Sequence, residues 1–259
     1  MSKTFALGGE RHVNRIGFGT MRLTGQPGNY GPYADWENGK ALLKHAVELG
    51  VQFFDSAFAY GPQWSDKIIG DALHPYPADV LIATKGGVDK PAPGKIVVDG
   101  SPQTLRNQLD LALANLKVDC VDLFQLHRID PNVPLEDSVG ALAAAREAGK
   151  IRFIGLSNVN REELDQAMSV TTIAAVQNRY NQAERDDDEL VDYTNEQGIA
   201  YLPWGPLGAQ PWEPGALLPA RAALAWLLAR SPNIIVIPGT TSRTHLEENL
   251  TAWEAIDDG

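Results

Sequence analysis

Polar residues close several of the apolar runs in this sequence, and their side chains are of types that exchange protons. The run Val51–Asp55 ends on a carboxylate, and Tyr60 follows five residues later in the context FFDSAFAYGP. Lys85 follows the next run in IATKGG, and His127 follows another in LFQLHR. Taken singly, each has a plain structural explanation, because Asp caps helices, Lys is usually solvated and a lone His is more often structural. Together they supply the groups that acid–base catalysis uses.

The elements that must position these residues are predicted by the alternation of apolar runs with helical patterns. Eight runs are predicted to be strands: Ile16–Gly19, Val51–Asp55, Val80–Thr84, Leu123–Leu126, Phe153–Ser157, Ala174–Gln177, Ala200–Pro203 and Ile234–Ile237. Eight stretches have the helical pattern: Trp36–Leu49, Ser65–Leu73, Pro102–Leu116, Leu135–Ala148, Arg161–Met168, Asp187–Gln197, Arg221–Ala229 and Arg243–Leu250. Continuously apolar strands are typical of a parallel sheet buried on both faces. The pattern predicts an α/β fold, a single (β/α)8 TIM barrel.

The start of the chain is predicted to form a short N-terminal β-hairpin at the bottom of this barrel. Phe5–Leu7 and His12–Val13 flank the turn residues Gly8 and Gly9. No linker or low-complexity tract divides the sequence, so residues 1–259 are expected to form one domain. In such barrels the active site lies at the carboxyl ends of the strands, where Asp55, Lys85 and His127 stand.

Charge and cysteine content exclude several classes of function. A formal net charge of −11 disfavours attraction to nucleic acid or to an anionic membrane, so an anionic ligand would need local cations or helix N-termini. Cys120 is the single cysteine, and the N-terminus lacks the apolar segment of a signal peptide. We therefore expect a cytoplasmic protein with a small-molecule partner. Its oligomeric state is open, with a monomer preferred.

Two other classes of enzyme lack their motifs here. A Rossmann dehydrogenase needs G-x-G-x-x-G, but Gly17-Phe18-Gly19 is followed by no third glycine at that spacing. A metal-dependent barrel hydrolase needs clustered ligands, and the five histidines form neither H-x-H nor H-E-x-x-H. No metal site is predicted.

In its motifs and their order, the sequence resembles the aldo-keto reductase family over essentially its whole length. Members carry an Asp at the end of strand two, a Tyr five residues on, a Lys at the end of strand three and a His at the end of strand four. The stretches GLSNV, QNRYN, PWGPLG and IPGTTSRTHLEEN resemble the nicotinamide and adenosine-phosphate contacts of the family. The resemblance implies NAD(P)H-dependent reduction of an aldehyde or ketone to an alcohol, with Asp55, Tyr60, Lys85 and His127 as the catalytic residues.

The roles implied for these four residues agree with elementary chemistry. Carbonyl reduction needs a proton donor as well as a hydride, and a tyrosine with a pKa of about 10 is a poor acid at neutral pH. Lys85 is expected to lower the pKa of Tyr60, and Asp55 to hold Lys85 in place. His127 is expected to orient the substrate oxygen by a hydrogen bond.

The family pattern also implies a site for NADPH, with NADH as an alternative. Ser157, Asn158 and Gln177 are implied to bind the nicotinamide carboxamide, and Trp204 to stack on the ring. Many relatives carry Lys where Gly239 stands and Arg where His245 stands, so Arg243 is expected to contact the 2′-phosphate. The implied set is Gly19, Thr20, Met21, Asp55, Ser157, Asn158, Gln177, Trp204, Gly205, Leu207, Gly208, Gly239, Thr240, Thr241, Arg243, Glu248 and Asn249.

The substrate side is expected at Met21, Phe58, Trp64, Arg128 and Trp212, although loop packing explains Phe58 and Trp64 equally well. NRIGFGTMRLTG and LAWLLARSPNIIVIPGTTS are most similar to a bacterial subgroup associated with pyridoxal reduction, which implies pyridoxal or another small aromatic aldehyde. The segment Leu207 to Leu224 and the tail after Asn249 look short for the family, so the shape of the pocket stays open. A second hypothesis is an NADP(H)-binding regulatory protein with little turnover, against which the complete set of four catalytic residues argues.

Overall fold

A parallel sheet that curls on itself lies at the centre of the computed structural model, which describes residues 2–208 and 219–257. Its seven strands pair in the order β11, β10, β9, β8, β5, β4 and β3, and every pair is parallel. The bounds are β3 (Phe18–Gly19), β4 (Phe53–Asp55), β5 (Leu81–Gly86), β8 (Val121–Leu126), β9 (Ile151–Ser157), β10 (Ala175–Gln177) and β11 (Ala200–Tyr201). Each strand overlaps one of the predicted runs, and β5, β8 and β9 extend beyond theirs.

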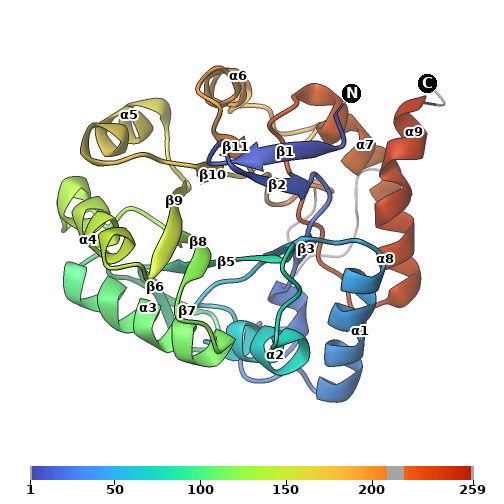
Figure 1. The fold of residues 1–259 in the computed structure, drawn as a ribbon, viewed down its shortest axis with the longest axis horizontal. Helices are drawn as coiled ribbons and strands as arrows, with labels where there is room; N and C mark the ends of the chain where they lie inside the picture. The colour runs from blue at the N-terminus through green and yellow to red at the C-terminus, as the bar shows by residue number, and fades with distance from the viewer. Residues whose placement is uncertain (1, 209–218, 258–259) are drawn as a thin grey trace.

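Helices follow one another around the outside of this sheet (Figure 1). They are α1 (Trp36–Glu48), α2 (Trp64–Leu73), α3 (Pro102–Leu116), α4 (Leu135–Glu147), α5 (Arg161–Val170), α6 (Asp188–Glu196), α7 (Ala220–Arg230) and α8 (Arg243–Leu250). The first and last are neighbours, since His45 Nε2 of α1 lies 3.0 Å from Glu247 Oε1 of α8. Helices that surround a curled parallel sheet form an α/β barrel-like fold.

The gap between the two edge strands is occupied by residues 233–238. The predicted strand Ile234–Ile237 lies in this segment, but it forms only single parallel bridges, between Tyr201 and Ile234 and between Ile16 and Val236. Ile235 N donates to Tyr201 O at 3.0 Å, and Gly19 N donates to Pro238 O at 3.1 Å. This approach requires a glycine, because a Cβ on Gly19 would lie 2.5 Å from the carbonyl oxygen of Ile237.

Local sequence signals explain where the helices begin. The Ser101 hydroxyl accepts a hydrogen bond from Thr104 N at the start of α3, and Pro102 occupies the first helical position. Asn160 and Glu163 form a capping box at the start of α5. The predicted bounds of α3 and α8 agree with the structure, and those of the other six helices differ by one or two residues.

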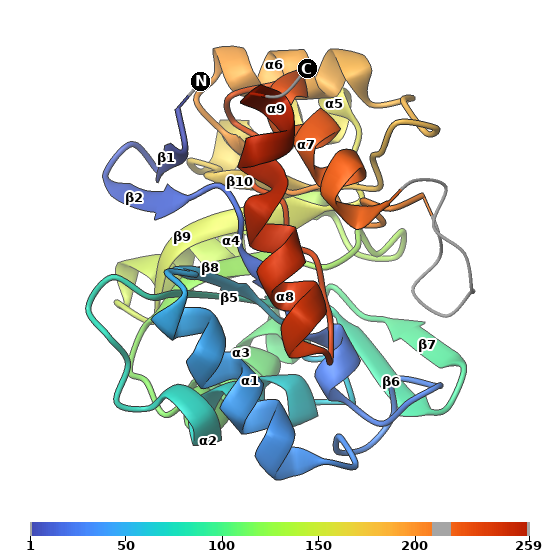
Figure 2. The same ribbon diagram turned by 90° about the vertical axis from the view of Figure 1, so that its right-hand side faces the viewer.

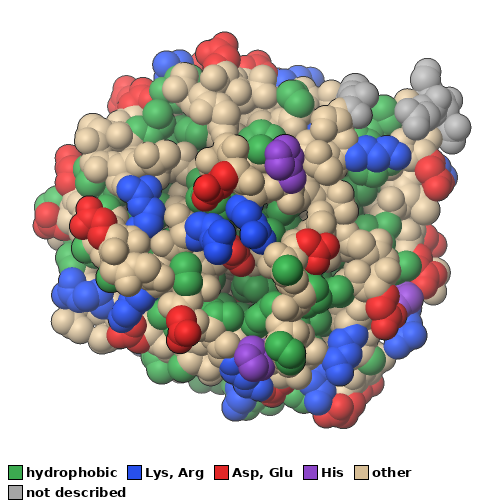
Figure 3. All heavy atoms as spheres, in the orientation of Figure 1, with side chains coloured by type: hydrophobic (Ala, Val, Ile, Leu, Met, Phe, Trp, Pro, Cys, Tyr) green, Lys and Arg blue, Asp and Glu red, His purple; other side chains and the backbone are tan. Residues whose placement is uncertain are grey.

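Two antiparallel hairpins stand at opposite ends of the sheet (Figure 2). One pairs β1 (Thr4–Leu7) with β2 (Arg11–Asn14), and the other pairs β6 (Val88–Ala92) with β7 (Lys95–Val98). Leu7 and Val13 of the first hairpin pack in one cluster with inward-facing residues such as Phe53, Leu81 and Leu123. The β1–β2 hairpin therefore closes one end of the sheet, on a face where acidic and basic side chains are interspersed (Figure 3).

The remaining elements are short. They are the 3-10 helices η1 (Met21–Leu23) and η2 (Thr251–Trp253) and the final helix α9 (Glu254–Asp257). The sequence patterns predicted neither η1 nor the β6–β7 hairpin, and both contribute to the site described next. Across residues 2–208 and 219–257, no helix combines the length and apolar character needed to cross a membrane.

Candidate active site

A buried ion pair joins the ends of two neighbouring strands. Asp55 is the last residue of β4 and Lys85 the fifth of β5, and both side chains are almost completely enclosed. Lys85 Nζ lies 2.9 Å from Asp55 Oδ1 and 2.8 Å from Oδ2, and it donates to Ser56 O at 2.7 Å. A buried pair is stable only when its hydrogen-bonding capacity is used, and these contacts meet that condition for the ammonium.

Two glutamine amides complete the surroundings of Asp55. Gln177 Nε2 donates to Asp55 Oδ1 at 2.9 Å, and Gln125 Nε2 lies 3.4 Å from the same oxygen. Gln125 stands opposite Lys85 in the β5–β8 register and is fully buried. The sequence predictions did not include Gln125, although a lone polar residue in the apolar run LFQL was the available signal.

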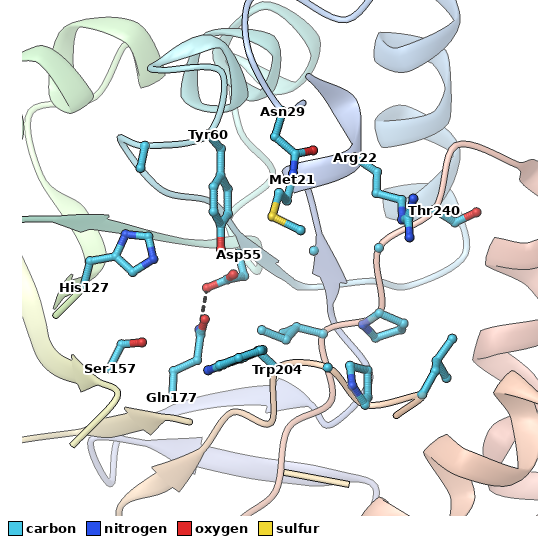
Figure 4. Close-up of a pocket in the computed structure, with 18 of the residues that line it drawn as sticks. Met21, Arg22, Asn29, Asp55, Tyr60, His127, Ser157, Gln177, Trp204 and Thr240 are labelled. Atoms are coloured by element: carbon cyan, nitrogen blue, oxygen red, sulfur yellow. Dashed lines mark hydrogen bonds between the residues drawn. The ribbon is translucent and has the colours of Figure 1, made fainter. Parts of the chain in front are cut away.

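Tyr60 and His127 lie beside this pair and face the same cavity (Figure 4). Their rings meet edge to face, with centroids 5.9 Å apart and planes at 86°. Lys85 Nζ lies 5.1 Å from the centroid of the Tyr60 ring. The structure thus brings together the four residues for which catalytic roles were expected.

The electrostatics of Tyr60 differ from the expectation that Lys85 would lower its pKa. Burial raises the pKa of Tyr60 above its ordinary value because it disfavours the phenolate, and the charge of Asp55 adds to this effect. Lys85 acts in the expected direction but does not outweigh burial. Burial alone would lower the pKa of Lys85, yet the charge of Asp55 and the contact with Tyr60 raise it, so the ammonium form is favoured.

His127 is a neutral imidazole at neutral pH. Burial holds its pKa well below the ordinary value, and the charges of Lys85 and Arg128 act in the same direction. Nδ1 is enclosed and has no hydrogen-bond partner among the described residues. A buried N–H without an acceptor is costly, so we assign the proton to Nε2. His127 can then donate a hydrogen bond to an oxygen in the cavity.

The cavity has a volume of about 1040 Å³ and extends from Asp55, Tyr60 and His127, which line it, toward α8 and the start of α7. Pockets that hold cofactors and substrates are of this size. Tyr60 and His127 lie at one end of the view in Figure 4, whereas Arg22 and Thr240 lie at the other. Of the predicted cofactor and substrate residues, those that line it are Gly19, Met21, Asp55, Arg128, Ser157, Asn158, Gln177, Trp204, Gly205, Leu207, Gly239, Thr240, Glu248 and Asn249.

Asn158 uses its amide mainly inside the protein. It has a left-handed backbone conformation with φ 58°, which asparagine tolerates better than most residues. Its Nδ2 donates to His127 O at 3.2 Å and to Ser157 Oγ at 2.9 Å, and its Oδ1 accepts from Trp204 Nε1 at 3.2 Å. Asn158 therefore holds His127 and Trp204 in place, beyond the ligand contact expected from the sequence.

Several expected residues lie away from the cavity wall. Thr20 is buried and its hydroxyl donates to Asp55 O at 2.8 Å. Phe58 is buried, and Trp64 packs edge to face on Trp36 with ring centroids 5.6 Å apart, so loop packing accounts for both. Gly208, Thr241 and Arg243 are also absent from the lining, and Trp212 lies outside the described residues.

Other lining residues were not anticipated from the sequence. They come mainly from η1, the loop that follows it, the β6–β7 hairpin and α8, and they include Arg22, Pro27, Asn29, Val88, Lys90, Ile96 and His245. Most of these elements were not predicted, so their side chains could not be placed in the site. The only signals available were the Gly and Pro residues that interrupt the chain on either side of β6 and β7.

A second buried carboxylate, Asp66, lies close to the ion pair. Its Oδ1 accepts from Thr84 Oγ1 at 2.9 Å, while Oδ2 has no partner among the described residues. Burial raises the pKa of Asp66 to about 6, against hydrogen bonds from Ser56 and Thr84 and the charge of Lys85. Within the described chain, no cluster of three His, Cys, Asp or Glu side chains is arranged to hold a metal ion.

Comparisons with known proteins agree with this fold. Residues 15–216 match the Aldo/keto reductase family. Pyridoxine 4-dehydrogenase of Escherichia coli is 39% identical over 267 residues, which cover 97% of this chain and 93% of that protein. Aldo-keto reductase yakc of Schizosaccharomyces pombe, named with NADP(+), is 31% identical over 293 residues, 94% of this chain and 85% of that one.

Among solved structures, the thermostable aldo-keto reductase Tm1743 in complex with the inhibitor epalrestat matches with a TM-score of 0.82. Its sequence is 28% identical, and the match covers 97% of this chain and 94% of that one. The chain belongs to the aldo-keto reductase family of NAD(P)H-dependent oxidoreductases.

Proposed function

We propose that this protein reduces an aldehyde or ketone to an alcohol with NADPH, and that Tyr60 donates the proton. The observation that supports this most strongly is that Asp55, Tyr60 and His127 line one end of a cavity of about 1040 Å³, with Lys85 paired to Asp55 directly behind them. NADPH, when bound, supplies the hydride that adds to the carbonyl carbon. The phenolic proton of Tyr60 then goes to the carbonyl oxygen.

Each of the four residues has a distinct part in this proposal. Because burial raises the pKa of Tyr60, its phenol keeps the proton at neutral pH until the carbonyl oxygen gains negative charge. Lys85, held by both oxygens of Asp55, then stabilises the phenolate that remains. The neutral His127 donates from Nε2 to the same carbonyl oxygen and fixes its position.

For the cofactor, we infer that the nicotinamide lies against Trp204 with its amide near Ser157 and Gln177. The phosphates then lie toward Gly239, Thr240 and Asn249. Arg22 and His245 line this end of the cavity, and a Cβ on Gly239 would lie 3.9 Å from Arg22 Cγ. The Arg22 guanidinium at this end favours NADPH over NADH, which agrees with the name of the relative yakc.

For the substrate and setting, we propose a small aromatic aldehyde such as pyridoxal. The name of the Escherichia coli relative, pyridoxine 4-dehydrogenase, supports this chemistry. We further propose that residues 234–237 act as the eighth strand of one barrel domain, and that the protein acts in the cytoplasm.

Fluorescence titration with NADPH and NADH tests the cofactor, and absorbance at the nicotinamide band tests turnover with a panel of aldehydes that includes pyridoxal. We expect NADPH to bind more tightly than NADH and to be consumed with at least one aldehyde. Tight NADPH binding without consumption across the panel would favour the regulatory alternative. Absence of cofactor binding would contradict both functions.

A further inference from the structure

Two cations line the substrate half of the cavity without a carboxylate partner in the described part of the chain. Arg128 follows His127 directly and is exposed, and no side-chain hydrogen bond or ion pair occupies its guanidinium there. Lys90, in β6, is only 9% exposed. Its Nζ donates to the carbonyl oxygens of Gly28 and Asn29, which leaves one of its three N–H bonds without a described acceptor.

These two residues stand on neighbouring parts of the rim. Strands β5 and β8 are paired, β6 follows β5, and Arg128 follows β8. The loop after β8 is also joined to the end of the hairpin segment, because Gly100 N donates to Asp130 Oδ2 at 3.1 Å. Arg128 therefore lies next to His127, whereas Lys90 Nζ lies against residues 28 and 29 in the loop between η1 and α1, and both residues line the same cavity.

Cations outnumber unpaired carboxylates among the described residues that line the substrate half of the cavity. Among the described lining residues, Asp55 and Glu248 are the carboxylates. Lys85 neutralises Asp55, and Glu248 belongs to α8 at the cofactor end. The substrate half is thus positive in a protein whose formal net charge is −11. Lys90 is a largely buried cation without a counter-ion among the described residues, which is unfavourable, and an anionic ligand would remove that cost; the exposed Arg128 guanidinium is free to bind the same ligand.

We propose that the substrate is a carbonyl compound that also carries a carboxylate or phosphate group, and that Arg128 and Lys90 bind this group. The inference rests on the proposed function, because it places the carbonyl at Tyr60 and His127. It narrows the proposed small aromatic aldehydes to those that carry an anionic group, such as pyridoxal 5′-phosphate rather than pyridoxal. Val88 and Ile96 of the hairpin also line the cavity and give its wall an apolar part that suits a hydrocarbon or aromatic body. A planar guanidinium binds either anion in bidentate geometry.

Matched substrates test the proposal. The first pair is 4-carboxybenzaldehyde and its neutral methyl ester, and the second is pyridoxal 5′-phosphate and pyridoxal. For each pair we measure the ratio of kcat/KM for the anionic compound to that for the neutral one. We expect a ratio of at least about 10 in one pair, expressed mainly in KM, and a decline as salt rises from about 0.05 M to about 0.5 M. The pair that shows it identifies carboxylate or phosphate as the recognised group.

Arg128→Met should lower this ratio by about tenfold or more, and Lys90→Met by a smaller factor. Lys95→Met removes an exposed cation from the same hairpin outside the cavity lining and should leave the ratio unchanged. Should Lys90→Met fail to fold, because Lys90 also holds residues 28 and 29, Arg128→Met and Arg128→Lys provide the test. Arg128→Lys should retain part of the discrimination.

A ratio near one in the wild-type protein for both pairs overturns the proposal while leaving carbonyl reduction intact. So does a loss of NADPH affinity in Arg128→Met with no change in the ratio, which would place Arg128 at the cofactor instead. Failure to reduce any neutral or anionic aldehyde contradicts the proposed function itself, so the two outcomes are distinguishable.

Discussion

Within the described chain, charged side chains are paired in one part of the site and unpaired in another. The paired ones are Asp55 and Lys85 in the interior, and the unpaired ones are Arg22, Lys90 and Arg128 on the rim of the cavity. In the interior, Lys85 donates to both Asp55 oxygens and to Ser56 O, and Gln177 donates to Asp55 as well. On the rim, the three cations have no carboxylate partner in the described residues, although the protein as a whole is acidic. The comparison indicates that folding alone supplies the partners of the charged groups in the interior. We propose that bound ligands supply the partners of the charged groups on the rim.

The largest effect should come from breaking the interior pair. Lys85→Met leaves Asp55 buried without its cation, and we expect a loss of about 3–5 kcal/mol in the free energy of unfolding. The kcat/KM for aldehyde reduction should fall by about 10³-fold or more, since the support for the Tyr60 phenolate is removed. Urea unfolding and steady-state kinetics measure the two effects.

The matched control is Lys150→Met. Lys150 Nζ lies 2.6 Å from Asp110 Oδ1, but both side chains are about half exposed. Solvent screens such a pair, so its loss should change the free energy of unfolding by about 1 kcal/mol or less and leave kcat/KM unchanged. Equal destabilisation by the two substitutions would contradict the contrast between buried and exposed pairs.

Asp66 is also an interior carboxylate, but its hydrogen bonds are incomplete among the described residues. Its folded pKa of about 6 lies above the ordinary value, so its stabilising contribution is full below about pH 4 and is lost as pH rises through about 6. Asp66→Asn should remove this pH dependence. The free energy of unfolding of the variant minus that of wild type should therefore be more favourable at pH 8 than at pH 4, by up to about 3 kcal/mol.

Urea unfolding at the two pH values gives this difference. The control is Asp119→Asn, which changes an exposed carboxylate in a turn and should show little difference between the two. If Asp66→Asn changes the free energy of unfolding equally at both pH values, folding does not raise the pKa of Asp66, and the assignment of its pKa is wrong.

On the rim, Arg22→Met should weaken NADPH binding by about tenfold without measurable loss of stability. Arg22 lines the cavity beside Gly239. Arg243→Met is the comparison variant, since Arg243 belongs to the same region but does not line the cavity. Fluorescence titration with NADPH and NADH gives the affinities. A larger effect from Arg243→Met would favour the contact expected from the sequence.

The smallest effect concerns pH. The pKa of Tyr60 is raised and that of His127 is well below its ordinary value, so neither group should titrate between about pH 7 and about pH 9. The kcat/KM for reduction should therefore vary by only about twofold in this range and fall as Tyr60 loses its proton at higher pH. If kcat/KM instead changes steeply with pH inside this range, and Tyr60→Phe abolishes that change, then Lys85 lowers the pKa of Tyr60 by more than burial raises it.

The barrel-like fold and the positions of Asp55, Lys85 and His127 were predictable because local patterns encode them, whereas Tyr60 was identified through the family resemblance. Continuous apolar runs mark buried parallel strands, and a polar residue at the end of each run falls at one end of the sheet. The positions of Asp55, Lys85 and His127 at the ends of three such runs therefore predict that their side chains meet. The ring-edge contact between Tyr60 and His127 agrees with that expectation.

The rim was less predictable, because it depends on irregular and inserted segments. The β6–β7 hairpin has no extended alternation, and Lys90 reads from the sequence as an ordinary solvated lysine. Its burial comes from residues 28 and 29, about sixty positions earlier in the chain. The direction of the Tyr60 pKa was also beyond the sequence, since it depends on how burial balances two opposite charges.

A single-turnover measurement with Tyr60→Phe tests the role of Tyr60 as proton donor most directly. The ring and its packing on His127 remain, and only the hydroxyl is removed. We expect NADPH to bind with nearly wild-type affinity, and the rate of NADPH consumption with an aldehyde that the wild-type protein reduces to fall by about 10³-fold. An unchanged rate, or a loss of NADPH binding that accounts for the whole effect, would contradict the role of Tyr60 as the proton donor.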